Sequence, residues 1–130
     1  VILKEAYRVL KPGGDFIFTD PMQADDVNPA ELAPIYNRIH LDDMGSFAFY
    51  RKVAKEIGFE EVAMEDHTHQ LANHYDRVRQ ELNSRYEELC NVSSKEYCDR
   101  MIEGLGHWVE GGRAGRLAWG ILHFRKPSLL

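Results

Sequence analysis

Residues 3–20 read LKEAYRVLKPGGDFIFTD, and this stretch decides the class of the fold. The apolar residues of its first part recur at helical spacing: Leu3, Ala6, Tyr7 and Leu10. The sequence Lys-Pro-Gly-Gly at residues 11–14 predicts the end of that helix. Residues 15–20 are aromatic and β-branched and are followed by Pro21, which is typical of a strand. Because this strand is apolar on both faces, we expect it in the interior of a covered parallel sheet.

The segment that follows the strand is predicted to be a loop and then a helix. Residues 21–29 are acidic and contain two prolines, which favours a loop. Residues 30–39 are predicted to form a helix that Pro34 weakens.

A second helix and a second strand complete an α/β unit. Apolar residues between positions 47 and 57 form a helical stripe, and Gly58 supplies a left-handed stop. Either Ser46 or Asp43 can cap the start of this helix. Residues 59–65 alternate between apolar and polar side chains and predict a strand. The order of strand, helix and strand indicates a layered α/β fold.

The rest of the chain predicts a helical insertion and a last strand. Apolar residues from Leu71 to Leu89 have the spacing of one amphipathic helix of about five turns. Residues 93–96, Ser-Ser-Lys-Glu, form a capping box that opens a second helix, which the glycine-rich residues 111–115 end. We therefore expect a single unit over residues 1–130, divided into a strand–helix–strand part (15–66), a helical insertion (68–112) and a last strand (117–126).

Composition and charge exclude several classes of protein. Sixteen Lys and Arg against twenty-one Asp and Glu give a net charge of −5, which disfavours nucleic-acid binding. No apolar run approaches the ~20 residues of a membrane-spanning helix. Lys4, Glu5 and Arg8 interrupt the first apolar stretch, so we expect no signal peptide. Cys90 and Cys98 are expected to be reduced thiols of a cytoplasmic protein.

Four segments carry a family resemblance. The sequence RVLKPGG at residues 8–14, before a buried strand that ends in Asp20, resembles the class I S-adenosylmethionine-dependent methyltransferases. Residues 19–22 (TDPM), 38–46 (RIHLDDMGS) and 107–115 (HWVEGGRAG) resemble the sarcosine/dimethylglycine N-methyltransferases, which make glycine betaine. The resemblance implies an α/β, partial Rossmann-like class I methyltransferase fold, corresponding to the C-terminal half of such an enzyme.

The same resemblance implies S-adenosylmethionine as the cofactor, but its main binding motifs are not found in this chain. The superfamily holds the cofactor with a glycine-rich turn after its first strand and an acidic residue that ends its second. Residues 111–115 are glycine-rich, yet they follow a predicted helix and precede a strand, which is the wrong order. We therefore expect no cofactor-binding residue in this chain and no activity of the chain by itself.

The resemblance directs attention to residues at the end of the first predicted strand. Methyl transfer to an amine is an in-line displacement in which positioning supplies most of the rate. Asp20 lies where open α/β sheets bind ligands, and we expect it to act as the catalytic residue facing the amine. Met22 is expected to line the substrate site. The alternatives are that Asp20 holds the turn at Pro21 and that Met22 only packs.

Further substrate-binding candidates come from later segments: His40, Asp43, Met44, Tyr75 and Arg113. The first three lie between two predicted helices, although His40 fits a surface residue and Asp43 a helix cap equally well. Tyr75 lies on an apolar helical stripe, where core packing is the alternative. Arg113 is flanked by glycines and has no evident packing role. Its planar fork suits a substrate carboxylate or a charge on a partner chain.

No metal site is predicted. His67, His69 and His74 resemble a ligand set, but His74 falls on the following helix and no fourth ligand has matching spacing. The expected partners are a small amine or amino-acid substrate and a second copy of the chain, since a sheet without its first four strands exposes an edge and apolar faces. Two other functions stay open: methylation of another small amine such as phosphoethanolamine, and a non-enzymatic association module.

Overall fold

The computed structural model describes residues 2–39 and 44–129. Its elements are α1 (Ile2–Val9), β1 (Asp15–Gln23), the 3₁₀ helix η1 (Pro29–Leu32), α2 (Ala33–Ile39), α3 (Phe47–Ile57), β2 (Glu60–Asp66), α4 (Thr68–Ser84), α5 (Tyr86–Val92), α6 (Lys95–Arg113) and β3 (Leu117–Arg125). This order contains the predicted strand–helix–strand part, the helical insertion and the last strand. None of the helices in the described ranges is long and apolar enough to cross a membrane.

The three strands form one sheet in the order β1-β3-β2. β3 runs antiparallel to both neighbours, with Phe18 of β1 and Met64 of β2 opposite Leu122 of β3. β1 and β2 therefore point the same way and end at the same edge of the sheet. Of the three strands only β3 is largely buried. The expectation that the first strand lies inside a covered parallel sheet was wrong for the described residues, because β1 lies at an edge of the sheet and pairs antiparallel with β3. The sequence also did not reveal that β3 separates the two parallel strands.

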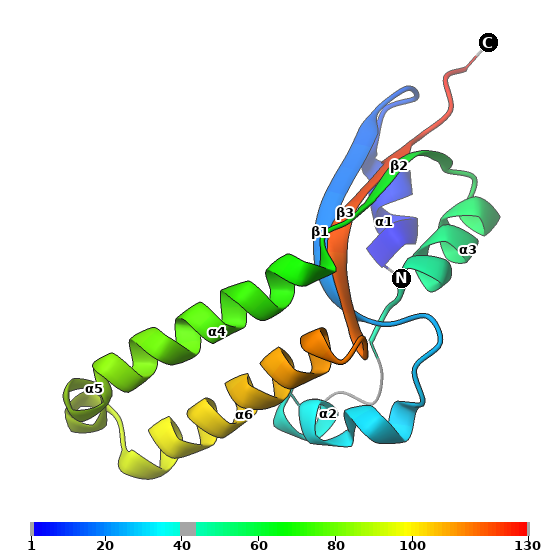
Figure 1. Cartoon of the computed structure of the whole chain (residues 1–130). Coiled ribbons are helices and arrows are strands. Elements are labelled where there is room, and N and C mark those ends of the chain that lie inside the picture. The colour runs from blue at the N-terminus through cyan, green and yellow to red at the C-terminus, as the bar shows by residue number, and fades with distance from the viewer. Residues whose placement is uncertain (1, 40–43, 130) are drawn as a thin grey trace.

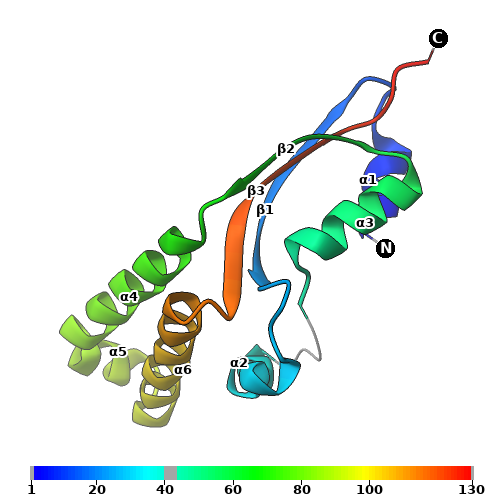
Figure 2. The same cartoon turned by 45° about the vertical axis from the view of Figure 1, so that its right-hand side comes forward.

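Helices α1 and α3 lie together on one face of the sheet (Figures 1 and 2). Between them and the strands is a set of buried side chains that we call the sheet core: Leu3, Met22, Ala54, Phe59, Ala118, Leu122 and Phe124. The ring of Tyr7 meets Phe59 edge-on, with centroids 5.0 Å apart, and Phe18 meets Tyr50 in the same way at 5.2 Å. On the other face of β1, the side chain of Ile17 is 59% exposed.

Helices α4 and α6 pack side by side and extend away from the edge at which β1 and β2 end (Figure 1). A second set of buried side chains, which we call the aromatic cluster, joins these helices to η1, α2 and β3. Its buried members are Leu32, Ile35, Tyr36, Leu71, Trp108 and Leu117, with Val27, Met44, Tyr75 and Trp119 packed against them.

Two predicted boundaries were wrong. β1 continues through Pro21 to Gln23 instead of ending at Asp20. A proline is tolerated there because β1 is an edge strand of the described sheet. The predicted helix of five turns is interrupted at Arg85, where α4 ends and α5 begins. The Ser84 hydroxyl donates to the Glu81 carbonyl at 2.9 Å, and the same carbonyl accepts from the Arg85 N–H at 3.1 Å.

The ends of α6 also differ from the prediction. Its N-cap is Ser94, one residue later than the capping box suggests, and the Ser94 hydroxyl accepts from the Tyr97 N–H at 3.1 Å. The helix continues through both glycines to Arg113, because Gly111 and Gly112 pack closely against neighbouring side chains. The predicted cap and stop of α3 are confirmed: Ser46 caps its start, and Gly58 ends it with a φ of 119°.

Candidate functional site

The edge at which β1 and β2 end is the natural place for a ligand, because open α/β sheets bind ligands beyond the carboxyl ends of their parallel strands. The last residues of β1 lie at this edge, and the helices α2, α4 and α6 gather beside it (Figures 1 and 2). The sheet core reaches this edge from one face and the aromatic cluster from the other.

Asp20 points toward α3. Its Oδ2 accepts a hydrogen bond of 2.6 Å from the Tyr50 hydroxyl. The two side chains line a cavity of about 460 Å³ together with apolar residues of α1, β1 and α3. Burial, and then the bond to the Asp20 carboxylate, raise the pKa of the Tyr50 hydroxyl well above its ordinary value. Tyr50 therefore stays a donor at neutral pH and orients the carboxylate.

The other predicted residues of this region take different positions. Met22 has no exposed surface and packs in the sheet core, in agreement with the packing alternative. Met44 and Tyr75 are half-buried and are brought together in the aromatic cluster. His40 and Asp43 lie outside the described residues. The role of all five in substrate binding stays a prediction.

Arg113 lies apart from these residues. It is the last residue of α6, and its Nη2 donates to Asp76 Oδ2 of α4 at 3.4 Å. Arg79 donates to the other oxygen of the same carboxylate at 2.7 Å. The Arg79 hydrogen bond and the charges of both arginines hold the pKa of Asp76 below its ordinary value. Arg113 is thus not a loop residue without a partner: it links α4 to α6, and it would have to leave Asp76 to hold a substrate carboxylate.

Sequence reasoning missed three features of this edge. Tyr50 was interpreted only as part of the apolar stripe of α3, because its partner lies thirty positions away. Gln23 at the end of β1 accepts a hydrogen bond from the Tyr36 hydroxyl of α2. Trp108 packs in the aromatic cluster, but its indole Nε1 is buried without an acceptor among the described residues. An orphaned buried donor costs ~1–3 kcal/mol.

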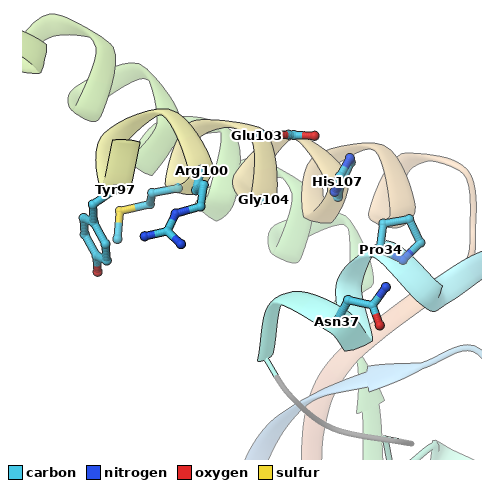
Figure 3. Close-up of a pocket in the computed structure, with 8 residues that line it drawn as sticks. Pro34, Asn37, Tyr97, Arg100, Glu103, Gly104 and His107 are labelled. Carbon is cyan, nitrogen blue, oxygen red and sulfur yellow. The ribbon is translucent and has the colours of Figure 1, made fainter. Parts of the chain in front are cut away.

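A groove of about 630 Å³ lies between α2 and α6 (Figure 3). Its lining is mixed: Pro34, Asn37, Tyr97, Arg100, Met101, Glu103, Gly104 and His107. It contains none of the residues predicted for the site from sequence. Within the described part of the chain, no group of three or more His, Cys, Asp or Glu side chains could hold a metal ion.

The described residues do not fit the expected cofactor. The three glycines with positive φ, Gly13, Gly58 and Gly115, each connect a helix to the strand that follows it. A cofactor-binding glycine turn of this fold connects a strand to the next helix. Such a turn does not occur in residues 2–39 or 44–129, so this part of the fold contributes no cofactor cradle of that kind.

Comparisons with known proteins agree with the family resemblance. The chain is 55% identical over 126 residues to a sarcosine/dimethylglycine N-methyltransferase of Aphanothece halophytica and 57% identical over 125 residues to that of Halorhodospira halochloris. The matches cover 97% and 96% of this chain but 46% and 45% of the relatives. The chain thus spans about half the length of the curated relatives it matches. No model of a known protein family matches the chain.

Solved structures give the same result. A candidate sarcosine dimethylglycine methyltransferase from Galdieria sulphuraria superposes with a TM-score of 0.92 and 42% identity, over 99% of this chain and 47% of that one. A phosphoethanolamine N-methyltransferase 2 of Haemonchus contortus, in complex with phosphomonomethylethanolamine and S-adenosylhomocysteine, has a TM-score of 0.84 at 17% identity, over 98% of this chain and 30% of that one. At that identity the likeness concerns the fold alone.

The fold is therefore that of a class I S-adenosylmethionine-dependent methyltransferase, of which this chain is a part. By sequence, the chain is similar to the sarcosine/dimethylglycine N-methyltransferases along nearly its whole length and corresponds to about half of theirs.

Proposed function

We propose that the enzyme of which this chain is a part methylates sarcosine and dimethylglycine to give glycine betaine, with S-adenosylmethionine as the methyl donor. The observation that supports this proposal most is the 55% identity to the Aphanothece halophytica enzyme along nearly the whole chain. Residues outside this chain would hold the donor, because the described residues lack the turn that the fold uses for it.

In this proposal Asp20 is the catalytic residue. Its carboxylate attracts the protonated amine, and it favours the cationic product as the nitrogen becomes quaternary. The Tyr50 hydrogen bond, at 2.6 Å, limits the rotamers of that carboxylate and so fixes the direction in which its charge acts. The attraction between a carboxylate and an ammonium group is stronger in a site with little water than in bulk water, because the local dielectric constant is lower.

The aromatic cluster supplies the surface for the methylated nitrogen. Met44 and Tyr75 are half-buried members of it, and both kinds of side chain suit a soft cation. We propose that they line the substrate site, and that His40 and Asp43, which precede Met44 in the chain, do so as well. Met22 supports the end of β1 from within the sheet core.

A chimera tests this function. In it, this chain replaces the matching residues of the Aphanothece halophytica enzyme, and the unmodified enzyme serves as the control. We expect the chimera to methylate sarcosine and dimethylglycine and to leave phosphoethanolamine unmodified. Turnover of phosphoethanolamine in place of the two glycine derivatives would overturn the proposed substrate. The isolated chain should bind no S-adenosylmethionine by calorimetry.

We also propose that the isolated chain forms a homo-oligomer, most simply a two-fold dimer. β1 pairs with β3 on one side, and among the described residues its other edge has no partner. Ile2, Ile17 and Phe49, near that edge, are more than half exposed. Sedimentation velocity should show association that increases with concentration; a monomer at all concentrations would contradict it.

A cytoplasmic location completes the proposal. It is supported by the two cysteines, Cys90 and Cys98, which are unpaired. Cell fractionation with an antibody against the chain tests it.

A further inference from the structure

The indole N–H of Trp108 is a buried polar group without a hydrogen-bond partner in the described structure. The residue lies on α6 and is 5% exposed, and its indole Nε1 has no hydrogen-bond acceptor among the described residues. Buried polar groups in native proteins are nearly always paired, so an orphaned donor of this kind calls for a reason. A ligand that supplies an acceptor is one such reason.

The neighbouring ring does not satisfy this donor. Tyr75 lies with its ring centroid 5.0 Å from that of Trp108, and the two planes are inclined by 39°. An N–H group that points at a ring face requires nearly perpendicular planes. The Tyr75 ring therefore packs against the indole without accepting from it, and the N–H remains available.

The position of Trp108 also favours a ligand. The aromatic cluster lies beside the edge at which the parallel strands β1 and β2 end, where ligands of α/β sheets bind. At this edge Gln23 of β1 is bonded to Tyr36 of α2, a second member of the cluster. The aromatic cluster, of which Trp108 is a buried member, therefore forms the wall beside the strand ends.

We propose that Trp108 is a substrate-binding residue whose indole N–H donates to a carboxylate oxygen of the methylated glycine. This inference rests on the proposed function, since that function defines a substrate with a carboxylate. The same wall offers the Tyr75 ring to the methylated nitrogen, so a single small amino acid satisfies both groups. Trp108 thereby distinguishes amines with a carboxylate from amines without one.

The experiment is Trp108→Phe in the chimera described above. Phenylalanine keeps an aromatic ring and removes the donor. We expect the KM for dimethylglycine to rise at least tenfold, equivalent to ~1.4 kcal/mol of binding. We expect kcat and the KM for S-adenosylmethionine to change less than threefold. In the variant without substrate, no hydrogen bond is lost, because the indole N–H has no acceptor there. Any change in the melting temperature should therefore reflect only the smaller ring.

Tyr97→Phe is the matched control. Tyr97 lies on the same helix, is 48% exposed and is not part of the aromatic cluster. We expect this variant to keep the KM for dimethylglycine within threefold. If Trp108→Phe does not fold, benzothienylalanine at position 108, which has the shape of tryptophan but no N–H, replaces it and carries the same expectation.

The outcomes separate the two proposals. A wild-type chimera that methylates dimethylglycine, with an unchanged KM in the Trp108 variant, overturns the role of Trp108 and leaves the proposed function intact. A wild-type chimera that methylates only amines without a carboxylate overturns both. A tenfold rise in KM for dimethylglycine, with kcat kept and the control unaffected, supports the assignment.

Discussion

The hydrogen bond between Tyr50 and Asp20 can be broken from either side, and the two changes predict different losses. Tyr50→Phe removes the donor and leaves a half-buried carboxylate without its partner. A hydrogen bond to a charged group contributes ~1.5–3 kcal/mol. Because both side chains are only partly buried, we expect the lower part of that range, ~1.5–2 kcal/mol, as a loss of unfolding free energy. Asp20→Asn keeps an acceptor for the tyrosine and should cost ~1 kcal/mol or less.

Catalysis should show the opposite order. Asp20→Asn removes the charge that faces the amine, so the turnover of the chimera should fall by roughly one to two powers of ten. Tyr50→Phe keeps that charge and only loosens its orientation, so its turnover should fall less, by about threefold to tenfold. The double variant should lose less stability than the two single losses added, because Tyr50→Phe removes the bond that Asp20→Asn only weakens.

Urea unfolding of the chain gives the stabilities, and initial rates of the chimera with dimethylglycine give the turnover. Tyr97→Phe is the matched control: this tyrosine is 48% exposed on α6, so the change should cost under ~0.5 kcal/mol. Equal turnover in Asp20→Asn and wild type, together with a large loss of stability, would refute the catalytic role and leave a structural one. Additive stability losses would refute the coupling.

The same bond makes a prediction about alkaline pH. The pKa of Tyr50 is raised in the folded state, so the folded chain holds this proton more tightly than the unfolded chain. The stabilisation is fully present below the ordinary tyrosine pKa of about 10 and is lost as the pH rises through the higher folded value. Absorbance at 295 nm should show one late-titrating tyrosine fewer in Tyr50→Phe than in wild type.

Three further predictions follow from other parts of the structure. Arg113→Lys should change the KM of the chimera for dimethylglycine less than twofold, because the guanidinium is exposed and bonded to Asp76; a rise above tenfold would restore the carboxylate-clamp hypothesis. Gly120→Ala should destabilise the chain by more than ~3 kcal/mol in urea unfolding, since a Cβ there would lie 2.0 Å from a backbone oxygen of β2. Gly106→Ala is the control: this glycine lies in the middle of α6 with room for a Cβ, so the change should be neutral or stabilising by up to ~1 kcal/mol. The imidazole and guanidinium groups bonded to Asp15 on β3 hold the pKa of its carboxyl below the ordinary value of 3.8. The stabilisation of the fold by this carboxylate is therefore present above about pH 4 and is lost as the pH falls through the lower folded pKa. In acid titration, Asp15→Asn should unfold with a shallower pH dependence than wild type.

Local patterns predicted the elements of the fold well, because each is encoded by residues close together in the chain. The stop after α1, the cap of α3 at Ser46 and the left-handed Gly58 all follow from such signals. The interruption at Arg85 could not be predicted in this way, because the apolar stripe continues across it. At Arg85 the backbone leaves the helical region, with φ of −115° and ψ of 21°, and no Gly or Pro in the sequence marks this position.

For the candidate site, the sequence could predict only the position of a residue along a strand. Asp20 was selected because strand ends bind ligands, and it does lie near the carboxyl end of β1, while its catalytic role stays a prediction. Its partner Tyr50 and the donor of Trp108 come from elements whose approach depends on the tertiary fold. The glycines before Arg113 suggested a loop, but in the structure they allow α6 to pack closely against α4. The partner of Arg113, Asp76, lies thirty-seven positions earlier in the chain, so local sequence could not reveal it.

The extension of β1 beyond Asp20 places polar side chains of one short motif on both faces of the sheet. Side chains alternate between the two faces of a strand, so Asp20 and Gln23, three positions apart, point to opposite faces. Asp20 meets Tyr50 of α3 on the face of the sheet core, and Gln23 meets Tyr36 of α2 on the face of the aromatic cluster. Opposite Asp20, β3 contributes Gly120, the one residue type that leaves room for the backbone of β2 and the ring of Phe47. Because β1 continues to Gln23, its end holds α3 against one face of the sheet and α2 against the other.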